Sequence, residues 1–325
     1  MGSTRAPARA EPRTLRDAQR TASERGFHSL ALASAILVVA ALAGIFALLL
    51  IGGLPALQRF GWRFLTATSW NPVTGVFGAL PPIYGTLVTS AIAMLIGVPT
   101  AFSIAFFINE LCPHRLRGPL TVGIELLAAV PSIIYGMWGL FILAPFLAAH
   151  VEPPLIDLLG PLPLVGALFR GAPFGIGMLT AGVILGIMIL PYIAAVARQA
   201  IGDVPLLLRE AAFAVGATRW EVFRHVLVPY ASHGLLGGVM LGLGRALGET
   251  MAVTFVIGNA HQVARSLLAP GTTISATLAN EFTEAVGDIY MSSLLALGLI
   301  LFIITFVVLA AARLLLGRTS PDAAA

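Results

Sequence analysis

Six long apolar stretches recur along this chain and leave few ways for it to fold. They lie at 30–51, 84–108, 120–149, 174–197, 234–258 and 289–312, and four of them contain no Asp, Glu, Lys or Arg. A helix of about 20 apolar residues, rising 1.5 Å per residue, crosses the ~30 Å hydrocarbon core of a bilayer. The composition agrees, because 58% of residues are hydrophobic, 10% are charged and the mean hydropathy is +0.93. The sequence therefore predicts an all-α integral membrane protein with six transmembrane helices.

The arginines in the loops predict the orientation of these helices. All 19 basic residues are arginine. Fourteen lie before the first stretch, between the second and third, between the fourth and fifth, or after the sixth, whereas four lie in the remaining loops. Positively charged loops stay on the inner side of a membrane, so both termini are expected in the cytoplasm. We expect residues 1–29 to form a disordered basic tail beside membrane lipid, 30–318 the transmembrane domain and 319–325 a short C-terminal tail.

Missing residue types exclude several chemistries. Without lysine the chain has no Walker A motif, and neither ATP hydrolysis by a P-loop nor catalysis through a lysine Schiff base is open to it. Cys112 is the single cysteine, and the six histidines show no metal-ligand spacing within one stretch. The chain is therefore not expected to be an enzyme, to hold a metal or cofactor of its own, or to bind nucleic acid.

Arg245 and Glu249 are the two charges inside the fifth stretch. A charge at the bilayer centre costs about 2.5–3.5 kcal/mol on insertion scales, so such residues usually face a partner or a water-filled path. On a continuous helix, positions four apart share one face, so the pair is expected to meet each other and one cavity. Two interpretations stay open: a structural salt bridge, or residues of a substrate pathway.

The loop at 203–229 predicts two short helices. Asp203 is expected to cap the first, with Pro205 in its opening turn, and Gly216 to end it. Thr218 followed by Glu221 is the capping-box pattern that predicts the start of the second.

The same loop resembles the EAA loop of ABC importer permeases. The pattern runs Glu210-Ala211-Ala212, three residues, Gly216, nine residues, and Val-Leu-Val-Pro at 226–229, where the family has I-x-L-P. The two valines are conservative departures. The resemblance implies a type I ABC importer permease fold, and it implies that Glu210, Ala211, Ala212 and Gly216 couple the chain to a cytoplasmic ATPase.

Further segments are similar to phosphate-specific ABC permeases, and to the PstC type more than to the paralogous PstA type. They are Gly-Leu-Gly-Arg-Ala-Leu-Gly-Glu-Thr-Met-Ala-Val at 242–253 and shorter matches at 82–90, 125–132, 135–140 and 279–282. The resemblance implies a multi-pass protein of the bacterial plasma (inner) membrane that imports inorganic phosphate. The implied partners are a second permease of the PstA type, a dimeric ATPase that binds ATP and Mg, and an extracytoplasmic phosphate-binding protein. Arg245 is expected to meet the anion, and Glu249 to neutralise Arg245 until phosphate arrives.

Three alternatives remain open at this point. A permease for sulfate, molybdate or tungstate would share the architecture and the loop. A secondary transporter driven by protons or sodium would work without an ATPase. A membrane-anchored signalling or assembly subunit is the third.

Overall fold

The protein is seen in a computed structural model that describes residues 15–163 and 165–317. Two compact units divide at Ile51, and helix α1 (Leu15–Phe60) extends from the first into the second. Because α1 begins at Leu15, the expectation of a disordered segment up to residue 29 is wrong for its second half. Residues 1–14 and the predicted C-terminal tail at 319–325 lie outside the described residues.

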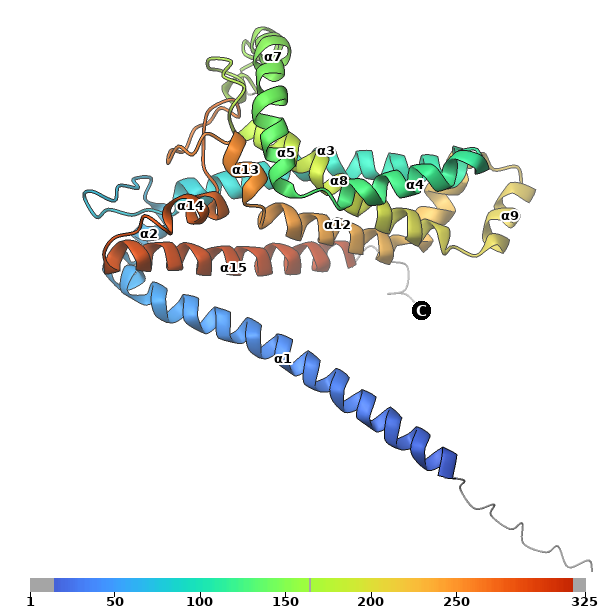
Figure 1. Ribbon diagram of the computed structural model, residues 1–325. Coiled ribbons are helices and arrows are strands. Elements are labelled where there is room, and N and C mark those ends of the chain that lie inside the picture. Colours follow the sequence, from blue (N-terminus) through green and yellow to red (C-terminus); the bar gives the residue numbers. More distant parts are fainter. Residues whose placement is uncertain (1–14, 164, 318–325) are drawn as a thin grey trace, which may run out of the picture. The chain divides into compact units, whose positions relative to one another are not determined.

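The six-span prediction agrees with the lengths and composition of the helices. Within 15–163 and 165–317, five helices are long and apolar enough to cross a membrane, at Phe27–Phe60, Leu80–Leu111, Ser132–Leu159, Met178–Gly202 and Asp288–Leu314. A sixth candidate is a pair, Arg219–Tyr230 and Ser232–Leu247, bent by 78°. Figure 1 shows the long helices α3 (Leu80–Phe106), α8 (Met178–Gly202), α12 (Ser232–Leu247) and α15 (Asp288–Gly317) running side by side.

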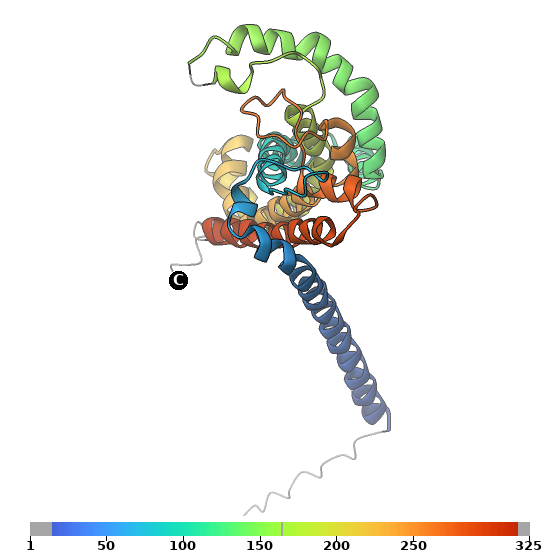
Figure 2. The same ribbon diagram turned by 90° about the vertical axis from the view of Figure 1, so that its left-hand side faces the viewer.

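The third span differs from its prediction at 120–149. Helix α4 (His114–Ala128) ends before Pro131, and a new helix starts at Ser132. Proline disfavours helical backbone in the residue before it, which explains the break. The segment from Ser132 to Leu159 curves along one side of the bundle (Figure 2). It alternates α-helical and π-helical turns: α5 (Ser132–Trp138), η2 (Gly139–Leu143), α6 (Ala144–Phe146), η3 (Leu147–Val151) and α7 (Glu152–Leu159).

The fifth span is also interrupted, so the prediction of one helix over 234–258 is wrong. Helix α12 ends at Leu247, and α13 (Met251–Val256) begins after a gap of three residues. Gly248 occupies the C-cap of α12. Glycine destabilises the interior of a helix and is common where a helix ends. The Glu249 carboxylate accepts the backbone N–H of Ala252 at 3.3 Å, which satisfies a donor of the new helix.

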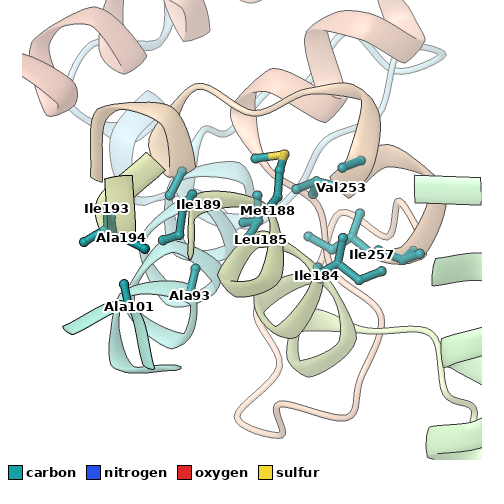
Figure 3. Packing of buried hydrophobic residues seen from close by; sticks show 14 residues of the cluster. Ala93, Ala101, Ile184, Leu185, Met188, Ile189, Ile193, Ala194, Val253 and Ile257 are labelled. Carbon is teal, nitrogen blue, oxygen red and sulfur yellow. The ribbon is translucent and has the colours of Figure 1, made fainter. Parts of the chain in front are cut away.

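Helix α8 is the centre of the core, since most of its residues are buried. Its Ile184, Leu185 and Met188 pack against small residues of α3 and against α13 (Figure 3). Glycine allows the closest approach between α3 and α8: a Cβ atom on Gly182 would lie 2.6 Å from Cβ of Ile92. The α3–α8 pair is therefore a rigid frame on which the other helices are placed.

The end of the bundle opposite the 203–229 loop is built from α2 (Arg63–Thr66), the 3-10 turn η4 (Gly166–Leu168), α14 (Ile274–Glu281) and the start of α15. Residues 271–277 are buried there, although they belong to a segment between spans. The backbone N–H of Ile274 donates to Thr86 Oγ1 of α3 at 3.0 Å, which holds the entry to α14 inside the protein.

Glu281, at the end of α14, links side chains from three other segments of this region through its carboxylate. Its carboxylate accepts hydrogen bonds from Trp70 Nε1 and Tyr290 Oη, both at 2.7 Å, and lies 2.6 Å from His261 Nε2. Burial raises the pKa of the Glu281 carboxyl group, but the hydrogen bonds to His261, Tyr290 and Trp70 together lower it below its ordinary value. The carboxylate form therefore stabilises this cluster.

Candidate functional site

A cavity of about 560 Å³ lies where α12 faces α8 and α15. Both charges of the fifth span reach it, as the sequence predicted. Its lining consists of one aromatic ring, two charged side chains, glycines and apolar side chains: Tyr192, Met240, Leu241, Gly244, Arg245, Gly248, Glu249 and Leu309. The two glycines leave room beside the charged groups.

Arg245 contacts an aromatic ring and a sulfur atom in this cavity, and it pairs with no carboxylate of residues 15–163 or 165–317. Its Cζ lies 4.7 Å from the centroid of the Tyr192 ring, a cation–π distance. Its Nη2 lies 4.0 Å from Met188 Sδ. Its Nε is buried and has no hydrogen-bond partner in the part of the chain that the structure describes. The guanidinium group therefore keeps unused donors.

Tyr192 is a site residue that the sequence analysis missed. Its hydroxyl donates to the carbonyl of Ala128 at 2.6 Å, and the Tyr135 hydroxyl donates to the carbonyl of Leu127 at 2.9 Å. These are the last carbonyls of α4, at the end where a helix leaves carbonyls without intrahelical partners; that of Leu127 also accepts the N–H of Val130 at 3.3 Å. The ring beneath Arg245 is thereby tied to the break between α4 and α5. A tyrosine within an otherwise apolar span was the one signal that could have revealed it.

Glu249 lines the same cavity but does not pair with Arg245. Within the described ranges, the ion pairs of 4.0 Å or less are Arg198–Glu125, Arg209–Glu110 and His261–Glu281. Glu249 is 8% exposed, and its carboxylate is engaged with the backbone of α13. The expected contact rested on a continuous helix, and the helix ends between the two residues. In this conformation Glu249 therefore does not neutralise Arg245 by direct contact.

The predicted pair of short helices in the 203–229 loop is present. They are α9 (Leu206–Ala214) and a second helix made of α10 (Arg219–Val222), η5 (Phe223–Leu227) and α11 (Val228–Tyr230). The Thr218–Glu221 capping box is confirmed. The predicted role of Asp203 is wrong: it is the C-cap of α8, and Pro205 is the N-cap of α9. Gly216 has φ of +89°, the left-handed conformation expected after a helix.

The residues of the EAA pattern are displayed at the surface of this loop. Glu210, Ala211 and Gly216 are exposed, whereas Ala212 is half-buried and packs on the cluster around Val222. Three apolar side chains beside them are strongly exposed: Leu206 at 66%, Leu207 at 75% and Val215 at 86%. Exposed apolar surface grouped around a turn is typical of a contact with another protein. The loop therefore presents exposed apolar side chains beside the residues of the EAA pattern.

The comparison with known families decides what kind of protein this is. The family described as "Binding-protein-dependent transport system inner membrane component" matches residues 97–321. The chain belongs to this family. It is a multi-pass inner-membrane component of an ABC importer that works with other subunits, and it is not an enzyme in itself. Membership excludes the ion-coupled secondary transporter considered above.

Individual relatives agree with this assignment. The chain is 59% identical to "Phosphate transport system permease protein PstC" of Mesorhizobium japonicum over 292 residues, covering 90% of this chain and 89% of the relative. A protein of the same name from Xylella fastidiosa is 52% identical, with 95% and 94% covered. A "Probable phosphate transport system permease protein PstC" of Methanocaldococcus jannaschii is 41% identical, with 78% and 81% covered.

Solved structures show the same fold at low sequence identity. A chain in the crystal structure of a bacterial alginate ABC transporter, in complex with an alginate pentasaccharide-bound periplasmic protein, superposes with a TM-score of 0.61. It is 18% identical, and the match covers 95% of this chain and 99% of that one. The fold is therefore the type I ABC importer permease fold, as the EAA pattern implied.

Proposed function

We propose that this chain is a permease subunit of an ATP-driven importer of inorganic phosphate and forms half of its translocation pathway. The observation that carries the proposal is Arg245, a half-buried side chain in the lining of a cavity of about 560 Å³, whose buried Nε has no hydrogen-bond partner among the described residues. A guanidinium group stays charged when desolvated and offers a planar fork of donors that matches phosphate oxygens. The names of the relatives, which are phosphate transport permeases, support phosphate over other oxyanions.

Glu249 belongs to the same pathway in this proposal, with a role that differs from that of Arg245. Its carboxylate accepts the N–H of Ala252 and so fixes the start of α13 at the cavity wall. Arg245 meets the anion, while Glu249 shapes the wall and sets the charge that the anion encounters.

The exposed loop supports the first of the partner assignments, the ATPase. A dimeric ATPase, which binds ATP and Mg, contacts Glu210, Ala211 and Gly216 together with the apolar side chains around them. Ala212 supports this surface from its half-buried position. A homologous permease of the PstA type supplies the other half of the pathway, and an extracytoplasmic phosphate-binding protein delivers the substrate at the opposite end. In this arrangement both termini and α9 lie on the cytoplasmic side.

Uptake of radiolabelled phosphate by proteoliposomes containing the whole complex tests the proposal. We expect uptake to require ATP inside, on the ATPase side, and to be insensitive to equal concentrations of sulfate, molybdate or tungstate. Arg245→Gln removes the charge and most of the donors at the cavity. A charged hydrogen bond contributes about 1.5–3 kcal/mol, so uptake below saturation should fall at least about tenfold.

Arg265→Gln is the matched control, because Arg265 is exposed and is not one of the residues that line the cavity. It should change uptake by no more than about twofold, as surface substitutions usually do. Full phosphate uptake by the Arg245→Gln complex would refute the role of Arg245. Strong competition by another oxyanion would instead assign the importer to that anion.

A further inference from the structure

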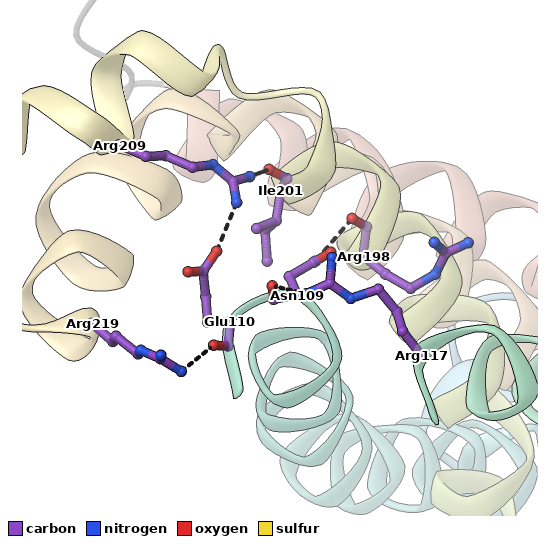
Figure 4. Close-up of polar contacts among 7 residues, drawn as sticks. All are labelled: Asn109, Glu110, Arg117, Arg198, Ile201, Arg209 and Arg219. Atoms are coloured by element: carbon purple, nitrogen blue, oxygen red, sulfur yellow. Dashed lines mark hydrogen bonds and ion pairs between the residues drawn. The ribbon is translucent and has the colours of Figure 1, made fainter. Parts of the chain in front are cut away.

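The end of α3 next to the EAA loop carries a polar network that the proposed function does not use. Helix α3 continues into η1 (Phe107–Leu111), which ends before Pro113. The last carbonyls of a helix lack partners and form its negative pole. Here Arg117 Nη2 donates to the carbonyl of Asn109, and Arg219 Nη1 donates to the carbonyl of Glu110, both at 2.8 Å (Figure 4). Arginines from α4 and α10 therefore converge on this helix end.

The Glu110 side chain adds a third arginine to this network, Arg209 of α9. Arg209 Nη1 lies 2.8 Å from Glu110 Oε1, and the two side chains are only 16% and 8% exposed. Through Nη2, the same guanidinium group donates to the carbonyl of Ile201 in the last turn of α8. Figure 4 shows Arg209 reaching both Glu110 and Ile201. One side chain thus joins α9 to the ends of α3 and α8, the pair that forms the rigid frame.

The two helices of the EAA loop are attached to α3 by different means. The second helix has apolar contacts in addition to Arg219, because the Phe106 ring lies 4.4 Å from the Phe223 ring and 5.5 Å from the Trp220 ring, centroid to centroid. Helix α9 contributes the Arg209 ion pair. Arg209 is also the residue directly before Glu210, the first residue of the EAA pattern. A displacement of α9 at its exposed residues therefore also moves Arg209.

We propose that the Glu110–Arg209 ion pair transmits the displacement of α9 to α3 and α8, which makes Glu110 a positioning residue of the transport cycle. This inference rests on the proposed function, because it requires an ATPase that moves α9. A buried ion pair resists separation, since parting it leaves a charge without compensation in a poorly solvated site. The ion pair therefore keeps α9 and α3 together whether α9 moves toward α3 or away from it. Helices joined by apolar contacts alone can shift relative to one another.

The test measures coupling separately from assembly. In proteoliposomes containing the whole complex, Glu110→Gln keeps the size of the side chain and removes its charge. We expect ATP hydrolysis to continue while the ATP hydrolysed per phosphate transported rises at least about tenfold, the change that follows the loss of one charged hydrogen bond. The exchanged pair Glu110→Arg with Arg209→Glu should bring this ratio part of the way back.

Glu125→Gln is the matched control. Glu125 also pairs with an arginine at this end of the bundle, but at 3.6 Å and with 58% of its side chain exposed. Its ratio should stay within about twofold of the unchanged complex. A Glu110→Gln complex whose ratio also stays within that range would overturn the inference. So would parallel losses of hydrolysis and uptake in proportion to the amount of intact complex, because they indicate a merely structural role.

A second measurement does not depend on the substrate. When a non-hydrolysable ATP analogue binds the unchanged complex, amide hydrogen exchange should change in 206–214 and in 104–111. In Glu110→Gln the change should persist in 206–214 and disappear from 104–111; its persistence in both segments would overturn the inference. If the unchanged complex takes up no phosphate, the proposed substrate is wrong, and this exchange experiment alone decides the role of Glu110. If Glu110→Gln does not assemble, Arg209→Gln, which removes the other charge of the pair, replaces it with the same criteria.

Discussion

Gly85 of α3 offers a sharp test of the buried segment that leads into α14. A Cβ atom at this position would lie 1.9 Å from the carbonyl oxygen of Thr272 and 3.0 Å from its carbonyl carbon. Both obstructing atoms belong to the backbone, so no side-chain rotation relieves the clash. Gly85 lies inside a regular helix, where alanine is otherwise preferred to glycine. Any destabilisation by Gly85→Ala therefore reports the contact with Thr272.

The magnitude follows from the distance that the segment must move. Ordinary contact begins at 3.4 Å, so α3 and Thr272 must separate by about 1.5 Å, the difference between 3.4 and 1.9 Å. That shift strains the core, at a cost of about 1–3 kcal/mol, and stretches the 3.0 Å bond from Ile274 N–H to Thr86 Oγ1. Losing this buried hydrogen bond costs about 1–3 kcal/mol of stability. The higher helix propensity of alanine offsets about 1 kcal/mol of the total loss. We expect a net loss of about 1–5 kcal/mol.

Thermal unfolding of the purified complex in detergent measures this loss. The control is Gly123→Ala in α4, where the added Cβ meets no atom of this chain within 4 Å. Gly123→Ala should leave the midpoint unchanged or raise it, because only the helix preference acts there. Gly85→Ala should lower the midpoint clearly. A Gly85→Ala midpoint equal to that of Gly123→Ala would refute the burial of the Thr272 segment against α3.

Two further predictions concern side chains outside the spans. Glu281→Gln should cost about 1–3 kcal/mol near neutral pH by weakening buried hydrogen bonds. Because the pKa of folded Glu281 lies below its ordinary value of 4.5, its stabilising contribution is complete above that pH and is lost as pH falls through the folded-state pKa. Unfolding midpoints of both proteins across pH should therefore converge in acid, and a constant gap would contradict this reasoning. Thr218→Ala removes the capping box and should destabilise α10 by about 0.5–2 kcal/mol, seen as faster amide exchange in 219–227 with α8 unchanged; equal exchange would count against the cap.

Hydropathy predicted the number of spans well and their continuity badly. A window of apolar residues shows that a segment is compatible with lipid, but it contains little information on whether the backbone stays helical. Pro131 and Gly248 mark the two breaks, and both are residues that end helices. Local capping signals were reliable in part: the Thr218–Glu221 box formed, whereas Asp203 caps the end of α8 and not the start of α9.

The polar segment 271–277 shows why burial was missed at the opposite end of the bundle. Its threonines look like residues of an exposed loop, and a single sequence does not show where their hydroxyl groups find partners. In the structure, Thr272 Oγ1 and Thr277 Oγ1 lie 3.0 Å apart, and Thr273 Oγ1 accepts the N–H of Ala276. Satisfied polar groups can be buried at little cost. These bonds are local, whereas the bond from Ile274 N–H to Thr86 Oγ1 of α3 is a tertiary contact that a sequence pattern does not reveal.

The break in the fifth span explains how Arg245 can stay without an anionic partner so close to Glu249. Arg245 lies in the last turn of α12, where the negative pole of the helix favours a cation. Glu249 lies just before α13, where the positive pole favours an anion, and it accepts the N–H of Ala252. Each charge is thus stabilised by its own helix end. On an unbroken helix the two would face each other four residues apart and neutralise one another. The interruption at Gly248 therefore explains why Arg245 and Glu249 do not pair among the described residues.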